Sequence, residues 1–158
     1  MVLPMLLVLM FGSFEMGRYF LDEHVVLKAV RDGARYASRQ TFTNYTCGSP
    51  GTVNAAVETN TRNVVRYGKP TVALADQPRL PYWGATTSGG APTVTVTLTC
   101  PTSLDGTEVH SGIYRGRPSV PVVTVAATVQ YNSLFGLLGM GSGAFNLTAE
   151  SQAAVMGI

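Results

Sequence analysis

Two cysteines and two histidines are the residues whose side chains could form a covalent cross-link or hold a metal ion. Cys47 and Cys100 lie in separate parts of the chain, and His24 and His110 are distant from both. These positions lack the short ligand intervals of zinc sites, so we expect no metal site. In an exported protein the two cysteines are expected to pair, which would stabilise the fold by about 4 kcal/mol on the chain-entropy model. The alternative is two buried free thiols.

Glu15, Arg18 and Asp22 are the most informative charged residues, because they directly follow an N-terminal run without any charge. Their spacings of three and four place them on neighbouring faces of a helix. One interpretation is a weak ladder of charges within a single helix. The other is that Glu15 pairs with a basic group of an adjacent subunit, where losing one partner would cost roughly 3–5 kcal/mol. We favour the second, because a carboxylate next to an apolar run is costly to bury.

No arrangement of residues predicts catalysis or cofactor binding. The sequence has no nucleophile elbow, no carboxylate pair with a spacing suited to acid–base chemistry and no Gly-rich phosphate loop beside a strand. The net charge of +2 is too small to indicate a nucleic-acid partner. We therefore expect a protein that is not an enzyme, with no catalytic, cofactor-binding or metal-binding residues and no cofactor.

The element that must position these charges is the segment 1–40, which we predict to be one long stalk helix. Residues 1–14 are uncharged, and apolar residues recur at helical spacing after Phe20. The uncharged run covers only about 21 Å as a helix, less than the roughly 30 Å core of a bilayer. We expect a few more apolar residues to precede Met1 in the native chain; otherwise Glu15 and Arg18 would have to pair near one membrane face.

Small residues along this helix are candidates for close helix packing. Gly12 and Gly17 lie in or beside the apolar part, where small residues let helices approach closely. Ala29, Gly33 and Ala37 form a stripe with a spacing of four. Two interpretations of the stripe are open, with equal weight: it packs against sister helices, or it receives the chain's own domain.

Residues 41–158 are predicted to form a small head domain. The segment 53–67 has helix-capping residues before it and Gly68 after it. The segments 93–100, 120–131 and 144–155 alternate apolar and polar residues as half-buried strands do. The composition, with 13% charged residues, 17 Gly and 9 Pro, suits an exported β-rich domain. The predicted fold is α+β: a long N-terminal hydrophobic helix (a pilin-like stalk), then one helix packed on a three- to four-stranded antiparallel sheet.

The segments FGSFEMGRYF and AVRDGARYAS resemble the start of the TadE-like proteins of the tight-adherence pilus system. NVVRYGKP and the two C-terminal β segments that bracket an apolar Leu/Gly loop resemble later parts of that family. The residues that carry the N-terminal resemblance are Pro4, Glu15, Gly17 and Arg18, then Gly33, Ala34, Arg35 and Tyr36.

The resemblance implies a pilin-like or pseudopilin-like protein, made with a basic leader that a prepilin peptidase removes. Since the leader, its cleavage site and an early Glu are not seen, we expect the sequence to begin a little inside the mature protein. The implied partners are identical or related pilin subunits, inner-membrane lipid before assembly, and the pilus assembly machinery. The implied location is the bacterial inner membrane, as a single pass with the head in the periplasm, or the extracellular pilus.

Two functions follow as expectations. The first is a structural subunit that polymerises, or joins the filament, through its N-terminal helix for surface adhesion. The second is a membrane-anchored periplasmic pseudopilin or assembly factor that does not itself polymerise. Residues expected in helix packing or assembly are Pro4, Gly12, Glu15, Gly17, Arg18, Ala29, Gly33 and Ala37. The loops 73–92 and 133–143 are expected to form contacts between heads.

Overall fold

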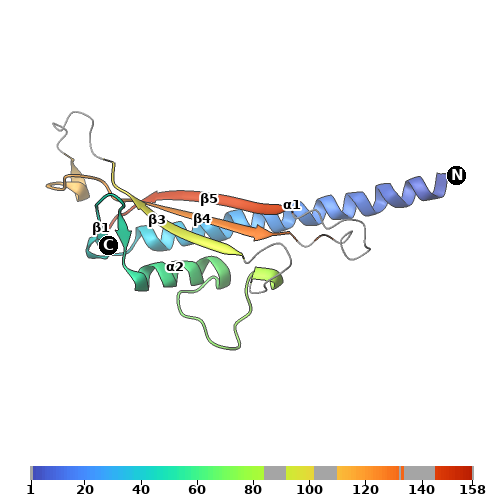
Figure 1. Cartoon of the computed structure of the whole chain (residues 1–158), viewed down its shortest axis with the longest axis horizontal. Helices are drawn as coiled ribbons and strands as arrows, with labels where there is room; N and C mark the ends of the chain where they lie inside the picture. The colour runs from blue at the N-terminus through green and yellow to red at the C-terminus, as the bar shows by residue number, and fades with distance from the viewer. Residues whose placement is uncertain (1, 84–91, 102–109, 132, 134–144, 158) are drawn as a thin grey trace.

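A computed structural model describes residues 2–83, 92–101, 110–131, 133 and 145–157 of the chain. Its first helix, α1 (Val2–Ser38), is 37 residues long and runs beyond the rest of the molecule at its N-terminal end (Figure 1). Part of the loop 73–92 and most of the loop 133–143, both expected to form contacts between heads, lie outside the described residues.

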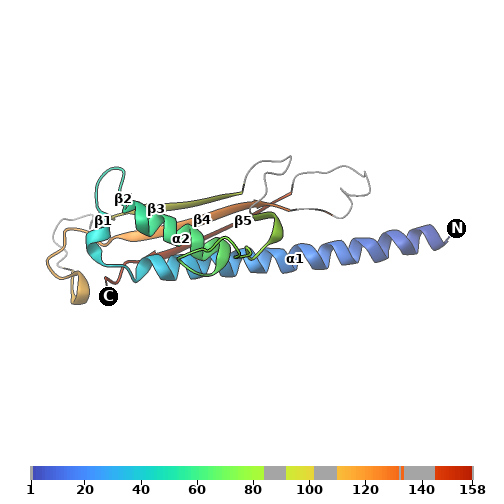
Figure 2. The same cartoon turned by 90° about the horizontal axis from the view of Figure 1, so that it is seen from below.

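A three-stranded antiparallel sheet lies along the C-terminal half of α1. Its strand order is β3 (Thr93–Thr99), β4 (Val122–Gln130) and β5 (Asn146–Ala154), with Val96 opposite Val125 and Val125 opposite Ser151. The alternating pattern of β4 sends every second side chain into the core, and these are fully buried. The C-terminal half of α1 and the second helix cover this inner face (Figure 2).

The second helix, α2 (Ala55–Tyr67), begins and ends where its capping residues predict. The Asn54 side chain accepts a hydrogen bond from the Ala56 amide at 2.9 Å, which satisfies one free donor of the first turn. Gly68 adopts the left-handed conformation, with φ of 82°, and its amide binds the Val64 carbonyl. The apolar face, which includes Val57 and Val65, is buried.

A second, smaller sheet consists of β1 (Tyr45–Thr46) and β2 (Thr52–Val53), which pair antiparallel. The remaining short elements are 3-10 helices, η1 (Phe42–Asn44), η2 (Pro81–Trp83) and η3 (Gly112–Tyr114). The Cys47–Cys100 disulfide joins the loop between β1 and β2 to the end of β3, across a sequence separation of 53.

The predicted architecture is wrong and needs correction. The head has two sheets, of two and three strands, where a single sheet of three to four strands was expected. The C-terminal half of α1 lies in the core beside α2, and both helices pack on the three-stranded sheet. Among the described residues, no helix combines the length and apolar character needed to span a membrane.

Candidate functional site: the exposed surface of the long helix

The N-terminal part of α1, Val2–Phe14, is an apolar surface that the other described residues of the chain leave uncovered. Leu3 is 72% exposed and Phe14 is 65% exposed, and the core begins to contact α1 only near Tyr19. We call this segment the apolar end of α1; its large exposed side chains, each 44–72% exposed, are Val2, Leu3, Met5, Leu6, Leu7, Val8, Leu9, Met10, Phe11 and Phe14. A monomeric soluble protein rarely exposes so large an apolar patch, so this end is a candidate interaction surface.

Gly12 and Gly17 face open space in this part of the helix. A Cβ atom built on either would meet no atom within 4 Å. Among the described residues, therefore, no neighbour requires a glycine at these two positions. Their expected role in close packing against another helix stays a prediction. Pro4 lies within α1, and its expected role stays a prediction as well.

A cluster of tyrosines and carboxylates marks the point where α1 leaves the domain. The Tyr131 hydroxyl donates to the Glu15 carbonyl at 3.3 Å, and its ring packs edge-on against Tyr19 with centroids 5.3 Å apart. The Tyr82 hydroxyl donates to the Asp22 carboxylate at 2.5 Å. These contacts hold η2 and the C-terminal end of β4 against the helix at this level. Arg18, the expected neighbour of both carboxylates, is exposed here.

The phenols of this cluster are held in their neutral form. Burial raises the pKa of Tyr131 to about 12, and the nearby Glu15 adds to the shift because a second negative charge would be repelled. Burial also raises the pKa of Tyr82, and its hydrogen bond to Asp22 acts in the same direction. These tyrosines therefore serve as hydrogen-bond donors across the physiological pH range. The predicted pairing of Glu15 with another subunit stays a prediction.

The stripe of Ala29, Gly33 and Ala37 is turned toward the chain's own domain. Ala29 and Ala37 are fully buried. A Cβ atom on Gly33 would lie 2.5 Å from Cγ2 of Val65, so the glycine lets α1 and α2 approach closely. In this structure the stripe receives α2 and the sheet, the second of the two interpretations left open by its spacing.

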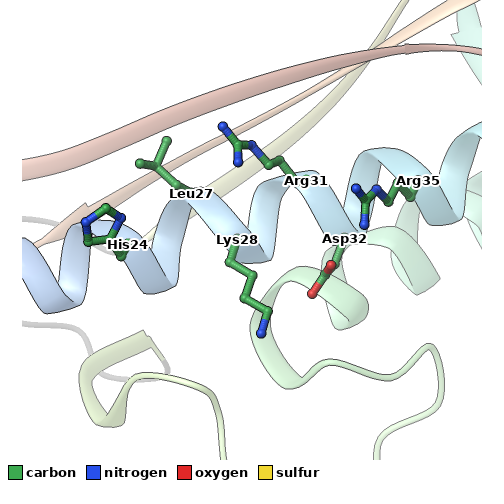
Figure 3. Close-up of a pocket in the computed structure, with 6 residues that line it drawn as sticks. All are labelled: His24, Leu27, Lys28, Arg31, Asp32 and Arg35. Atoms are coloured by element: carbon green, nitrogen blue, oxygen red, sulfur yellow. The ribbon is translucent and has the colours of Figure 1, made fainter.

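A hollow on the exposed side of α1 is lined by basic side chains. Figure 3 shows its lining residues, which all come from this helix: His24, Leu27, Lys28, Arg31, Asp32 and Arg35. The Asp32 carboxylate already pairs with the Arg79 guanidinium at 2.9 Å. The described residues contain no group of three or more His, Cys, Asp or Glu side chains that could hold a metal ion. The chemistry available at this hollow is therefore attraction of acidic groups.

The sequence analysis did not single out this basic surface as a candidate site. The signal was present, because His24, Lys28, Arg31 and Arg35 follow one another at intervals of four, three and four. That alternation places residues on one face of a helix. The spacing alone could not tell whether the domain covers this face, and the structure shows that all four residues are exposed.

The expected disulfide is present. The Cα atoms of Cys47 and Cys100 lie 5.7 Å apart, and both cysteines of the chain are in this bond. The bond ties the small sheet to the three-stranded sheet at the end of the molecule farthest from the apolar end of α1.

Comparison with known proteins gives one match. Residues 1–35 match the family model described as TadE-like protein, which confirms the predicted resemblance for nearly all of α1. No curated protein and no solved structure matches the chain. The family match covers the apolar end, the residues that α1 contributes to the tyrosine cluster, and the basic hollow, but it does not reach the sheet. Over its first 35 residues this chain is similar to the TadE-like proteins, and that similarity indicates a protein associated with the tight-adherence (Tad) pilus.

Proposed function

We propose that this chain is a structural, non-enzymatic subunit that joins a tight-adherence pilus through the apolar end of α1. The head domain would then lie on the outside, available for adhesion to a surface. Identical or related pilin subunits are the proposed partners. The observation that carries this proposal is the exposure of the apolar end, on a helix whose first 35 residues match the TadE-like family.

Energetics favour a covered state of the apolar end. Burying a large apolar side chain contributes about 1.5–3 kcal/mol. With a cluster of such side chains each 44–72% exposed, covering the segment would stabilise an assembly by on the order of 10 kcal/mol. Packing against similar helices of other subunits supplies that cover, and Gly12 and Gly17 offer places where backbones can approach closely.

A second candidate function is an assembly factor that is held at the inner membrane and does not polymerise. The same observation supports it, because lipid could cover the apolar end on all sides just as effectively as the helices of other subunits. The two candidates differ in where the mature chain is found. A subunit leaves the cell with the filament, whereas an assembly factor stays behind.

Two preparations test the proposal. We expect a chain lacking residues 2–14 to be a folded, soluble monomer, because no residue of this segment belongs to the core cluster or packs against it in the part of the chain that the structure describes. We expect the full chain to be found in filaments sheared from its host. Presence of the chain only in the membrane fraction would favour the assembly factor, and filaments formed by the shortened chain would contradict both.

A matched pair of point variants sharpens the test. Leu7→Glu places a charge in the apolar end, and Thr95→Glu places the same charge on the exposed outer face of the sheet. Only Leu7→Glu should remove the chain from filaments, while both variants should keep the unfolding midpoint of the head. Equal loss from both would mean that the apolar end is not the assembly element.

A further inference from the structure

The exposed face of the C-terminal half of α1 carries one sign of charge. We call His24, Lys28, Arg31 and Arg35 the basic row; all four are exposed and line the hollow of Figure 3. Within the part of the chain that the structure describes, the ion pairs are made by Arg62, Lys69 and Arg79. The cations of the basic row make none, and the only carboxylate on the hollow, Asp32, is bound to Arg79.

The basic row continues an exposed apolar row on the same helix face. Leu3, Leu7, Met10, Phe14 and Leu21 precede it at the same alternation of three and four residues, with Gly17 at the position between Phe14 and Leu21, and each of the five apolar residues is 44–72% exposed. Together the two rows form a heptad-like face along nearly the whole helix. A face with this repeat over more than four heptads is typical of a helix that packs along another helix.

The charges on this face disfavour a second copy of the same chain. In a parallel pair, residues at these positions meet their own counterparts, so Lys28 would face Lys28 and Arg31 would face Arg31. In an antiparallel pair, the basic row of each copy would lie against the apolar row of the other. Like charges in contact, and cations placed against apolar surface, both oppose association.

We propose that this face binds a helix of a different protein chain, parallel to α1, whose matching face is apolar in its first half and acidic in its second. The argument is charge complementarity: three unpaired cations on a helix repeat require carboxylates at the same repeat. This inference rests on the proposed function. Only when a partner helix covers the apolar end of α1 does that helix also come into contact with the basic row. The inference adds that the partner along this face is a distinct subunit and identifies it by its acidic row.

A charge-inverted variant of this chain supplies the probe. Lys28→Glu, Arg31→Glu and Arg35→Glu together give a helix that keeps the apolar row and carries an acidic row. In a non-ionic detergent that keeps each chain dispersed, we expect the parent and this variant to form a one-to-one pair, measured by sedimentation and by energy transfer between labelled chains. Raising the salt from low to high concentration should weaken the pair by about tenfold or more, because exposed charges are screened.

Two comparisons show whether the face itself is responsible. The parent alone and the inverted variant alone should each pair far more weakly than the mixture. The control variant Lys69→Glu, Arg115→Glu and Arg117→Glu carries the same change in net charge on exposed residues outside α1. It should bind the parent no better than the parent binds itself. Equal pairing by the control, or a mixture no tighter than the parent alone, would overturn the proposal.

Two further arms separate the remaining outcomes. If the parent binds vesicles of phosphatidylglycerol, the inverted variant does not, and the mixture fails to pair, then the basic row contacts lipid and the proposal is wrong. In the host, inversion of the basic row should remove the chain from its assembly, as deletion of residues 2–14 should. If the deletion removes it while the inversion leaves assembly intact, the proposed function stands and this inference fails.

Discussion

Gly33 is the residue on which the packing of the two helices depends most directly. A Cβ atom there would lie 2.5 Å from Val65 Cγ2, and Val65 is fully buried, so its side chain has little room to move. We expect Gly33→Ala to lower the free energy of unfolding by about 1–3 kcal/mol, the usual cost of overpacking a core. Urea denaturation would measure this change.

Gly17→Ala is the matched control for that substitution. It lies in the same helix, and its added Cβ atom meets nothing within 4 Å. The better helix propensity of alanine should leave stability unchanged or raise it by up to about 1 kcal/mol. If both substitutions have the same effect on unfolding, the close approach of α1 and α2 at Gly33 is not as described.

Two buried tyrosines predict a loss of stability at alkaline pH. Burial raises the pKa of both Tyr45 and Tyr131 from the ordinary phenol value of 10.0 to about 12. In each case the pKa in the folded state lies above the pKa in the unfolded state. The contribution of the neutral phenol to the free energy of unfolding is therefore complete below pH 10 and is lost as the pH rises through 12. Each phenol would account for at most about 2–3 kcal/mol.

Unfolding measured between pH 8 and 12 would test this expectation. The free energy of unfolding should be level at first and then fall. The double variant Tyr45→Phe, Tyr131→Phe should be less stable at neutral pH, because Tyr45 loses its hydrogen bond to the Ala37 carbonyl, but its stability should depend less on alkaline pH. If the free energy of unfolding of the variant falls with pH as steeply as that of the parent, these two phenols are not the cause of the alkaline loss of stability.

At the scale of elements, sequence patterns predicted most of the helices and strands. The alternation in β3 and β4 and the capping residues of α2 set ends that agree with the structure to within about two residues. Phe145 falls within the predicted strand segment 144–155, but it precedes β5 and is 64% exposed. The second sheet was missed because two-residue strands such as β1 are too short to produce an alternating pattern.

The candidate site was predictable only in part, for a similar reason. The uncharged run showed that the apolar end needs a cover. The basic row was not recognised as one surface, because its spacing does not show how much of the helix the sheet and α2 cover. Small residues such as Gly33 favour a close neighbour, and only the fold identifies that neighbour as the chain's own α2.

The disulfide is a covalent link between the two sheets, beside the backbone bridge between Gly51 and Leu98. Because Cys47 and Cys100 are 53 positions apart, closing this loop in the unfolded chain predicts a stabilisation of about 4 kcal/mol. The variant Cys47→Ser, Cys100→Ser should therefore unfold at a lower temperature than the parent. Reduction should abolish the difference in unfolding temperature between the parent and the variant. If reductant leaves the unfolding temperature of the parent unchanged, the bond has no structural role.

At the scale of the whole molecule, α1 has two different roles along its length. Its C-terminal half supplies part of the core of the head, and its apolar end lies clear of the head with its side chains exposed (Figure 1). The tyrosine cluster around Glu15 and Asp22 lies where one role changes to the other. This division explains why the head should fold without residues 2–14 and why the complete chain should need a partner.

Photo-crosslinking in the host tests the central claim most directly. A benzoyl-phenylalanine residue at Leu7, in the apolar end, should form covalent adducts with another protein chain. The same probe at Thr95, on the outer sheet face, serves as the reference position. The account predicts protein adducts from Leu7 that disappear when the other pilus components are absent. Adducts with lipid alone, or none at all, would contradict it.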